Sequence, residues 1–117
     1  MKKYKTLDNK VLTEIKLEPN KKTYYNVTKG QTIIDSFIIN NLGSYAFVPD
    51  FINTSLNNLK LLSRVDTIKP NTLKLIKYQY QIDNNYIDKK KILTFSIIVA
   101  GNCNLNIRTV KVSGFLK

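Results

Sequence analysis

The chain has 117 residues with one cysteine and no histidine, and its 19 basic and 8 acidic residues give a formal net charge of +11. This length suits one domain that buries a core without disulfides. A single cysteine excludes an internal disulfide and a C-x-x-C motif, and the lack of histidine excludes Ser-His and Cys-His catalytic pairs. The basic excess consists of 17 lysines and 2 arginines beside 14 asparagines and 14 isoleucines, which is a composition typical of AT-rich genomes. We therefore interpret most lysines as solvated surface residues and keep a polyanion site as the alternative.

The beginning of the chain lacks the features of an export signal. Residues 1–22 are basic at the start but contain no continuous apolar segment. The longest apolar runs elsewhere have the length of strands, well short of the roughly 18 residues of a membrane helix. We expect cytoplasmic synthesis, with deposition at a spore or cell surface by a route without a classical signal. Residues 1–9 are expected to form a flexible basic arm, and 10–117 a single domain.

The first half of the chain has the pattern of β-strands. Four residues alternate with mostly charged ones and define one face of a first strand: Val11, Thr13, Ile15 and Leu17. A second strand is predicted over 22–28 and a third over 32–40, joined by a Lys29-Gly30 turn. Residues 41–44 form the next turn. A short strand follows over 45–52, and Pro49 within it indicates a sheet edge or a bulge.

The second half continues the pattern after one ambiguous segment. Residues 53–63 fit either a strand or a helix with Leu56, Leu59 and Leu62 on one side, and the run 59–68 favours a strand. Two later strands have clear apolar faces, formed by Ile76, Tyr78, Tyr80 and Ile82 and by Leu93, Phe95, Ile97 and Val99. The last strand is predicted over 105–115. About seven strands with turns roughly every ten residues predict an all-β fold, an immunoglobulin-like antiparallel β-sandwich.

Two blocks of the sequence resemble a known family. The run GQTIIDSFIINNLGS (30–44) is similar to the Gly-Asp-Thr, strand, Asn-x-Gly-Ser pattern of the bacterial conserved-repeat domain, also called domain of unknown function eleven. The run 91–114 is similar to the last two strands of that family. Asp35 stands where the family usually has Tyr, and the family's Asp-x-Leu-Pro turn is not reproduced.

The resemblance implies a non-enzymatic module of bacterial surface proteins or spore-associated appendages. Because the chain holds one copy, we expect a subunit that associates with itself or with another protein. The segment with Val11, Thr13, Ile15 and Leu17 is the predicted self-assembly strand, which would pair with the edge of a neighbouring sheet. The alternative is that this segment pairs within its own domain.

Basic and aromatic residues suggest a second function, the binding of nucleic acid or another polyanion. Stacking aromatics beside phosphate-neutralising lysines would bind such a polymer. The candidate contacts are Lys89, Lys90 and Lys91, then Lys21 and Lys22 with Tyr24 and Tyr25, and finally Lys74 and Lys77 with Tyr78 and Tyr80.

A third hypothesis is a binding module of a phage or secretion apparatus that presents loops from a rigid scaffold. Its predicted apolar contact patch is Tyr45, Phe47 and Phe51. An enzyme is not expected, because the aspartates are isolated from any nucleophile, base or Gly-rich phosphate loop. We predict no catalytic, metal or cofactor residues, and we interpret Cys103 as an inert thiol because no basic residue adjoins it.

Overall fold

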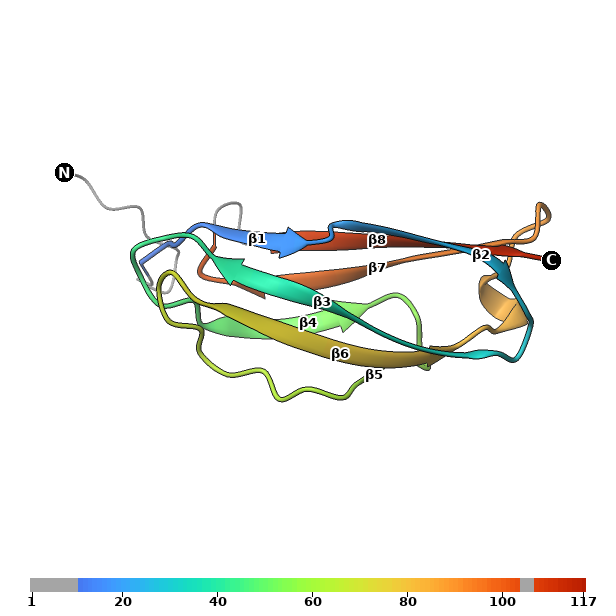
Figure 1. Ribbon diagram of the computed structural model, residues 1–117, viewed down its shortest axis with the longest axis horizontal. Helices are drawn as coiled ribbons and strands as arrows, with labels where there is room; N and C mark the ends of the chain where they lie inside the picture. The colour runs from blue at the N-terminus through green and yellow to red at the C-terminus, as the bar shows by residue number, and fades with distance from the viewer. Residues whose placement is uncertain (1–10, 104–106) are drawn as a thin grey trace.

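The computed structural model describes residues 11–103 and 107–117, so the predicted arm 1–9 lies outside the described residues. Eight strands form two four-stranded sheets in an elongated molecule (Figure 1). The described part of the chain contains no α-helix, only a 3₁₀ turn, η1 (Asn84–Tyr86). The prediction of an all-β fold is confirmed, and no helix in this part could span a membrane.

The strand order defines the two sheets. The first sheet has the order β1 (Ile15–Glu18), β3 (Thr32–Asn41), β6 (Leu73–Gln81) and β5 (Lys60–Leu61). The second has the order β2 (Lys21–Val27), β8 (Ile107–Leu116), β7 (Ile92–Gly101) and β4 (Pro49–Thr54).

One pairing corrects the antiparallel prediction. All strand pairs are antiparallel except β2 and β8, which are parallel. The chain passes from the first sheet to the second between β1 and β2 without reversing its direction (Figure 1). Strand β2 therefore reaches β8 with both strands running the same way.

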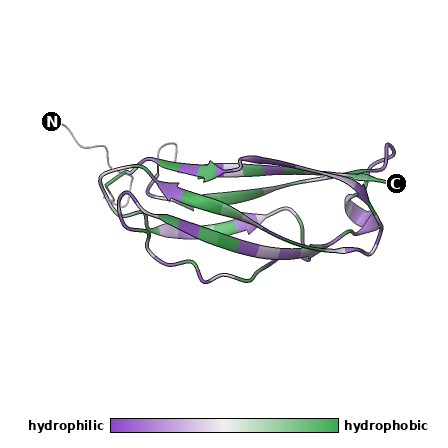
Figure 2. Cartoon of the chain, in the orientation of Figure 1, coloured by the Kyte–Doolittle hydropathy of each residue, from purple (hydrophilic) through white to green (hydrophobic). Residues whose placement is uncertain are grey.

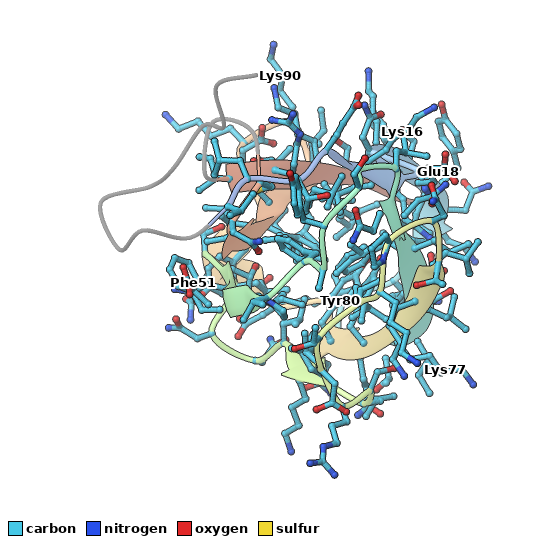
Figure 3. The ribbon with its side chains drawn as sticks, turned by 90° about the vertical axis from the view of Figure 1, so that its left-hand side faces the viewer. Lys16, Glu18, Phe51, Lys77, Tyr80 and Lys90 are labelled. Carbon is cyan, nitrogen blue, oxygen red and sulfur yellow. The ribbon has the colours of Figure 1, made fainter. Side chains whose placement is uncertain are left out.

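The two sheets pack against each other across one apolar core. Apolar and polar residues alternate along the strands (Figure 2), and the predicted faces of β6 and β7 are buried throughout. Tyr80 of the first sheet meets Phe95 of the second edge to face, with ring centroids 4.9 Å apart. Figure 3 places Tyr80 between the sheets. Period-two patterning therefore predicted the core of these strands correctly.

The segment around residues 45–68 is less regular than predicted. Pro49 begins β4 at the edge of its sheet, and the register shifts between Pro49 and Phe51, as expected for an edge or bulge proline. Residues 53–63 form no helix; they contain the end of β4, a turn and the two-residue β5. The side chain of Leu56 fills the core beneath this turn.

The run from Gly30 to Ser44 is a strand between two turns. Gly30 has a φ of +84°, which favours glycine, so the predicted left-handed turn is confirmed. Gly43 is needed for a different reason: a Cβ there would lie 1.9 Å from Thr13 Oγ1 and 2.6 Å from the Glu14 amide nitrogen. The segment before β1 crosses this loop at contact distance.

Two buried asparagines fasten the loops at this end of the molecule. Asn41 accepts hydrogen bonds from the Thr13 hydroxyl and the Gly43 amide and donates to the carbonyls of Tyr45 and Ile68. Asn102 accepts from the Val48 amide and donates to the carbonyls of Val11 and Ala46. Both side chains hydrogen-bond to backbone groups of several loops, so their role is structural.

Candidate interaction surfaces

The predicted self-assembly strand lies in its own domain. Thr13, Ile15 and Leu17 are buried, Val11 is half-buried, and β1 pairs with β3 in the register Ile15–Asn41 to Glu18–Ile38. Pairing of this segment with another copy would require it to leave its own core. Intermolecular pairing through this strand stays a prediction.

The predicted apolar contact patch is wrong in one residue. Phe47 is fully buried because its backbone bridges Ile68 and its ring packs over Gly101. Tyr45 is half-buried. Phe51 of edge strand β4 is 53% exposed and points away from the core (Figure 3). The exposed apolar surface here therefore consists of Phe51 and the adjoining Val48, which is also exposed.

A polar cluster lies between β2 and β3 and removes two residues from the predicted polyanion contacts. The Lys22 ammonium is 2.8 Å from the Asp35 carboxylate, to which the Tyr24 hydroxyl and the Ser36 amide also donate. Burial alone would raise the pKa of Asp35, but these donors outweigh it and lower that pKa. Burial, and then the Asp35 carboxylate, raise the pKa of Tyr24. Lys22 and Tyr24 are thus engaged internally rather than available to a ligand.

The tyrosines of β6 are core residues and not stacking platforms. Tyr78 and Tyr80 are almost fully buried, and among the described atoms their hydroxyl oxygens have no hydrogen-bond partner. Burial raises the pKa of Tyr78 to about 12 and also raises that of Tyr80. Lys74 and Lys77 are exposed, and Lys77 points outward in Figure 3. The predicted Lys-Tyr grouping on β6 is therefore wrong, because alternation places the tyrosines inside.

Other predicted polyanion residues do share a surface. Lys21 and Tyr25 are exposed on the outer side of β2, and the Tyr25 ring stacks on Phe115 of β8 at a centroid distance of 5.4 Å. The turn with Lys89, Lys90 and Lys91 lies beside the end of β8, because the Leu116 amide donates to the Lys91 carbonyl. Phe115 was missed by sequence reasoning, since only the β2–β8 pairing brings it to Tyr25.

Asp83, Asp88 and Cys103 are engaged in turns and in the core. No three His, Cys, Asp or Glu side chains in the described ranges could hold a metal ion together. Asp83 and Asp88 accept hydrogen bonds from turn amides. Cys103 is fully buried, and burial raises its pKa. Asp83 and Asp88 therefore stabilise turns, and Cys103 is part of the core.

Comparisons with known proteins give structural likeness only. No protein-family model matches the sequence, and no curated protein matches it. The fold is similar to a Porphyromonas gingivalis W83 protein of unknown function (TM-score 0.71, 18% identity, 90% of this chain and 47% of that one). It is also similar to PapD-like domain 7 of human CEP192, with a TM-score of 0.61, 6% identity, and coverage of 91% of this chain and 87% of that one. The likeness to the periplasmic chaperone SfaE has a TM-score of 0.58 and 9% identity, and covers 88% of this chain and 58% of that one. The chain thus spans about half the length of the Porphyromonas gingivalis protein, and the likenesses support an immunoglobulin-like or PapD-like fold.

Proposed function

We propose that the chain is a non-enzymatic, immunoglobulin-like β-sandwich module that associates with copies of itself. The order β1-β3-β6-β5 matches strands A, B, E and D of a constant-type immunoglobulin domain, and β4, β7 and β8 match C, F and G. Strand β2 is then an extra strand at the edge beside G. This assignment supports a scaffold that acts through its surfaces. The family resemblance favours a bacterial surface or spore-associated setting for it.

The observation that carries self-association is the free edge of β4. Among the described residues, this six-residue strand pairs on one side only, with β7. An unpaired strand edge offers backbone donors and acceptors to a second chain. Exposed Phe51 and Val48 add apolar area beside that edge. One structural neighbour is named a chaperone, which also favours a protein as the partner.

Light scattering coupled to size exclusion, at two protein and two salt concentrations, tests this proposal. We expect the molar mass to rise with protein concentration. Phe51→Lys should restore the monomer, because a charge beside an edge strand opposes pairing. Leu73→Lys is the matched control, since Leu73 is 59% exposed on the outer face of the other sheet. A monomer under every condition, or equal effects of both variants, would overturn assembly through β4.

A further inference from the structure

The outer face of the β2-β8-β7-β4 sheet carries an exposed aromatic platform, formed by Tyr25 and Phe115. The two rings are stacked with an interplanar angle of 10°, and Tyr25 is 72% exposed. Stacking on each other covers only one side of each ring. The platform therefore leaves aromatic surface open at the edge of the sheet.

A β-bulge holds Tyr25 in this exposed position. In a regular strand, Tyr25 and Val27 would share a face. The register shifts between them, and the intervening Asn26 has a φ of 58°, a conformation that asparagine tolerates. Val27 consequently turns into the core while Tyr25 stays outside. The bulge thus lets Val27 pack in the core while the Tyr25 ring remains exposed to solvent.

Lysines accompany the platform along the same face. Lys21 of β2 is paired in register with Lys111 of β8, and both are exposed. They lie four residues from Tyr25 and Phe115, about 13 Å along the strands. Lys91 is exposed, and its carbonyl accepts from the Leu116 amide, so its backbone lies beside the platform's end of β8. Strands β2, β7 and β8 contain no acidic residue, and the nearby Asp88 is engaged by turn amides.

Hydroxyl side chains line the face beside the lysine pair. An open hollow of about 390 Å³ adjoins Lys111. It is lined by two core residues and by four residues with hydroxyl groups, namely Ser55, Thr94, Ser96 and Ser113. Thr23 pairs with Ser113 in register, midway between the platform and the lysines. The face therefore presents, in sequence along β2 and β8, aromatic rings, hydroxyls and ammonium groups.

We propose that this face binds an acidic polysaccharide. Aromatic rings pack on the apolar faces of sugars, serine and threonine hydroxyls exchange hydrogen bonds with sugar hydroxyls, and lysines pair with carboxylates or sulfates. The 13 Å spread suits a polymer better than a small anion. Nucleic acid is disfavoured because no arginine fork adjoins the platform: Arg108 donates to the Ile15 carbonyl, and Arg64 lies beside Asp66 outside this sheet.

Biolayer interferometry with immobilised polygalacturonate, dextran and a single-stranded oligothymidylate tests the proposal on the full chain. We expect binding to polygalacturonate that weakens with salt, and none to neutral dextran. Tyr25→Ala and Lys21→Ala/Lys111→Ala should each weaken it at least tenfold. Lys60→Ala/Lys77→Ala removes two exposed charges from the other sheet and should change it less than twofold.

Three outcomes would overturn the proposal. The first is an absence of polygalacturonate binding at low salt. The second is an equal loss in both double-lysine variants, which would indicate attraction by net charge alone. The third is tighter, platform-dependent binding of the oligothymidylate, which would assign the face to nucleic acid. Because the lysine variants change exposed side chains only, their thermal melts should match the unmutated protein. This test does not depend on self-association through β4, provided that it is run where light scattering gives a monomer.

Discussion

Asp35 is a charged residue on a strand face that also carries apolar core residues. Strand alternation places it on the inward side of β3, and Lys22 and Tyr24 from β2 meet it there. Removing its charge leaves the Lys22 ammonium half-buried without its carboxylate. Charge-assisted hydrogen bonds of this kind contribute about 1.5–3 kcal/mol. Asp35 therefore links the two sheets electrostatically.

The lowered pKa of Asp35 predicts acid sensitivity. Because the folded pKa lies below the unfolded value of about 3.9, the stabilisation is complete above pH 4 and is lost as pH falls through the folded pKa. Asp35→Asn should lower the free energy of unfolding by about 2 kcal/mol at pH 7. We expect the difference from the unmutated protein to shrink below pH 4, measured by urea denaturation. Asp66→Asn, an exposed control, should lower the free energy of unfolding by less than about 0.5 kcal/mol. A stability difference between Asp35→Asn and the unmutated protein that does not change with pH would refute the role of the ion pair.

At the scale of elements, the buried faces of β6 and β7 were predicted from the sequence, whereas β2 and β4 were predicted only in part. Ile76 and Ile97 follow strict alternation, and local pattern suffices for such strands. The bulge at Asn26 breaks alternation, so pattern alone would put Tyr25 and Val27 on one face. The strand predicted over 45–52 is observed over 49–54. Phe47 lies before this strand, where its backbone forms one isolated bridge with Ile68 and its side chain is buried.

The crossing of β1's leading segment over the Asn41–Ser44 turn predicts a sensitive glycine. Gly43→Ala would place a Cβ against the Glu14 backbone, which cannot rotate away, and should destabilise the fold by about 1–3 kcal/mol. Gly114→Ala is the matched control, because its Cβ would meet Val27 at an ordinary 3.5 Å. Midpoints of urea unfolding measure both. Equal midpoints would show that the crossing is looser than the structure has it.

At the scale of the whole molecule, the sequence predicted the fold class and the core faces but not the parallel strand pairing. Composition and period two gave the all-β class and the core faces. The parallel β2–β8 pairing could not be predicted, because strands 80 or more residues apart carry no local sign of their partnership. The stacking of Tyr25 on Phe115 depends on that pairing. The candidate binding face was therefore visible in the sequence only as separate fragments.

Global unfolding should control access to Cys103. Its thiol is fully buried and its pKa is raised by burial, so little thiolate meets solvent in the folded state. We expect Ellman's reagent to react at least 100-fold more slowly with the native protein than with the protein in 6 M urea. The rate should rise with urea in parallel with loss of circular dichroism. Fast reaction without urea would instead indicate local opening of the bridge between Thr13 and Cys103.

The place of β8 within its sheet has a consequence for synthesis on the ribosome. This strand lies between β2 and β7, yet it comprises residues 107–116 of the chain. A nascent chain that lacks it can complete the first sheet, but it leaves β2 without a partner and one edge of β7 unpaired. Completion of the second sheet must wait until β8 has emerged from the exit tunnel. Until then, the exposed apolar strands are a natural substrate for chaperones that bind nascent chains.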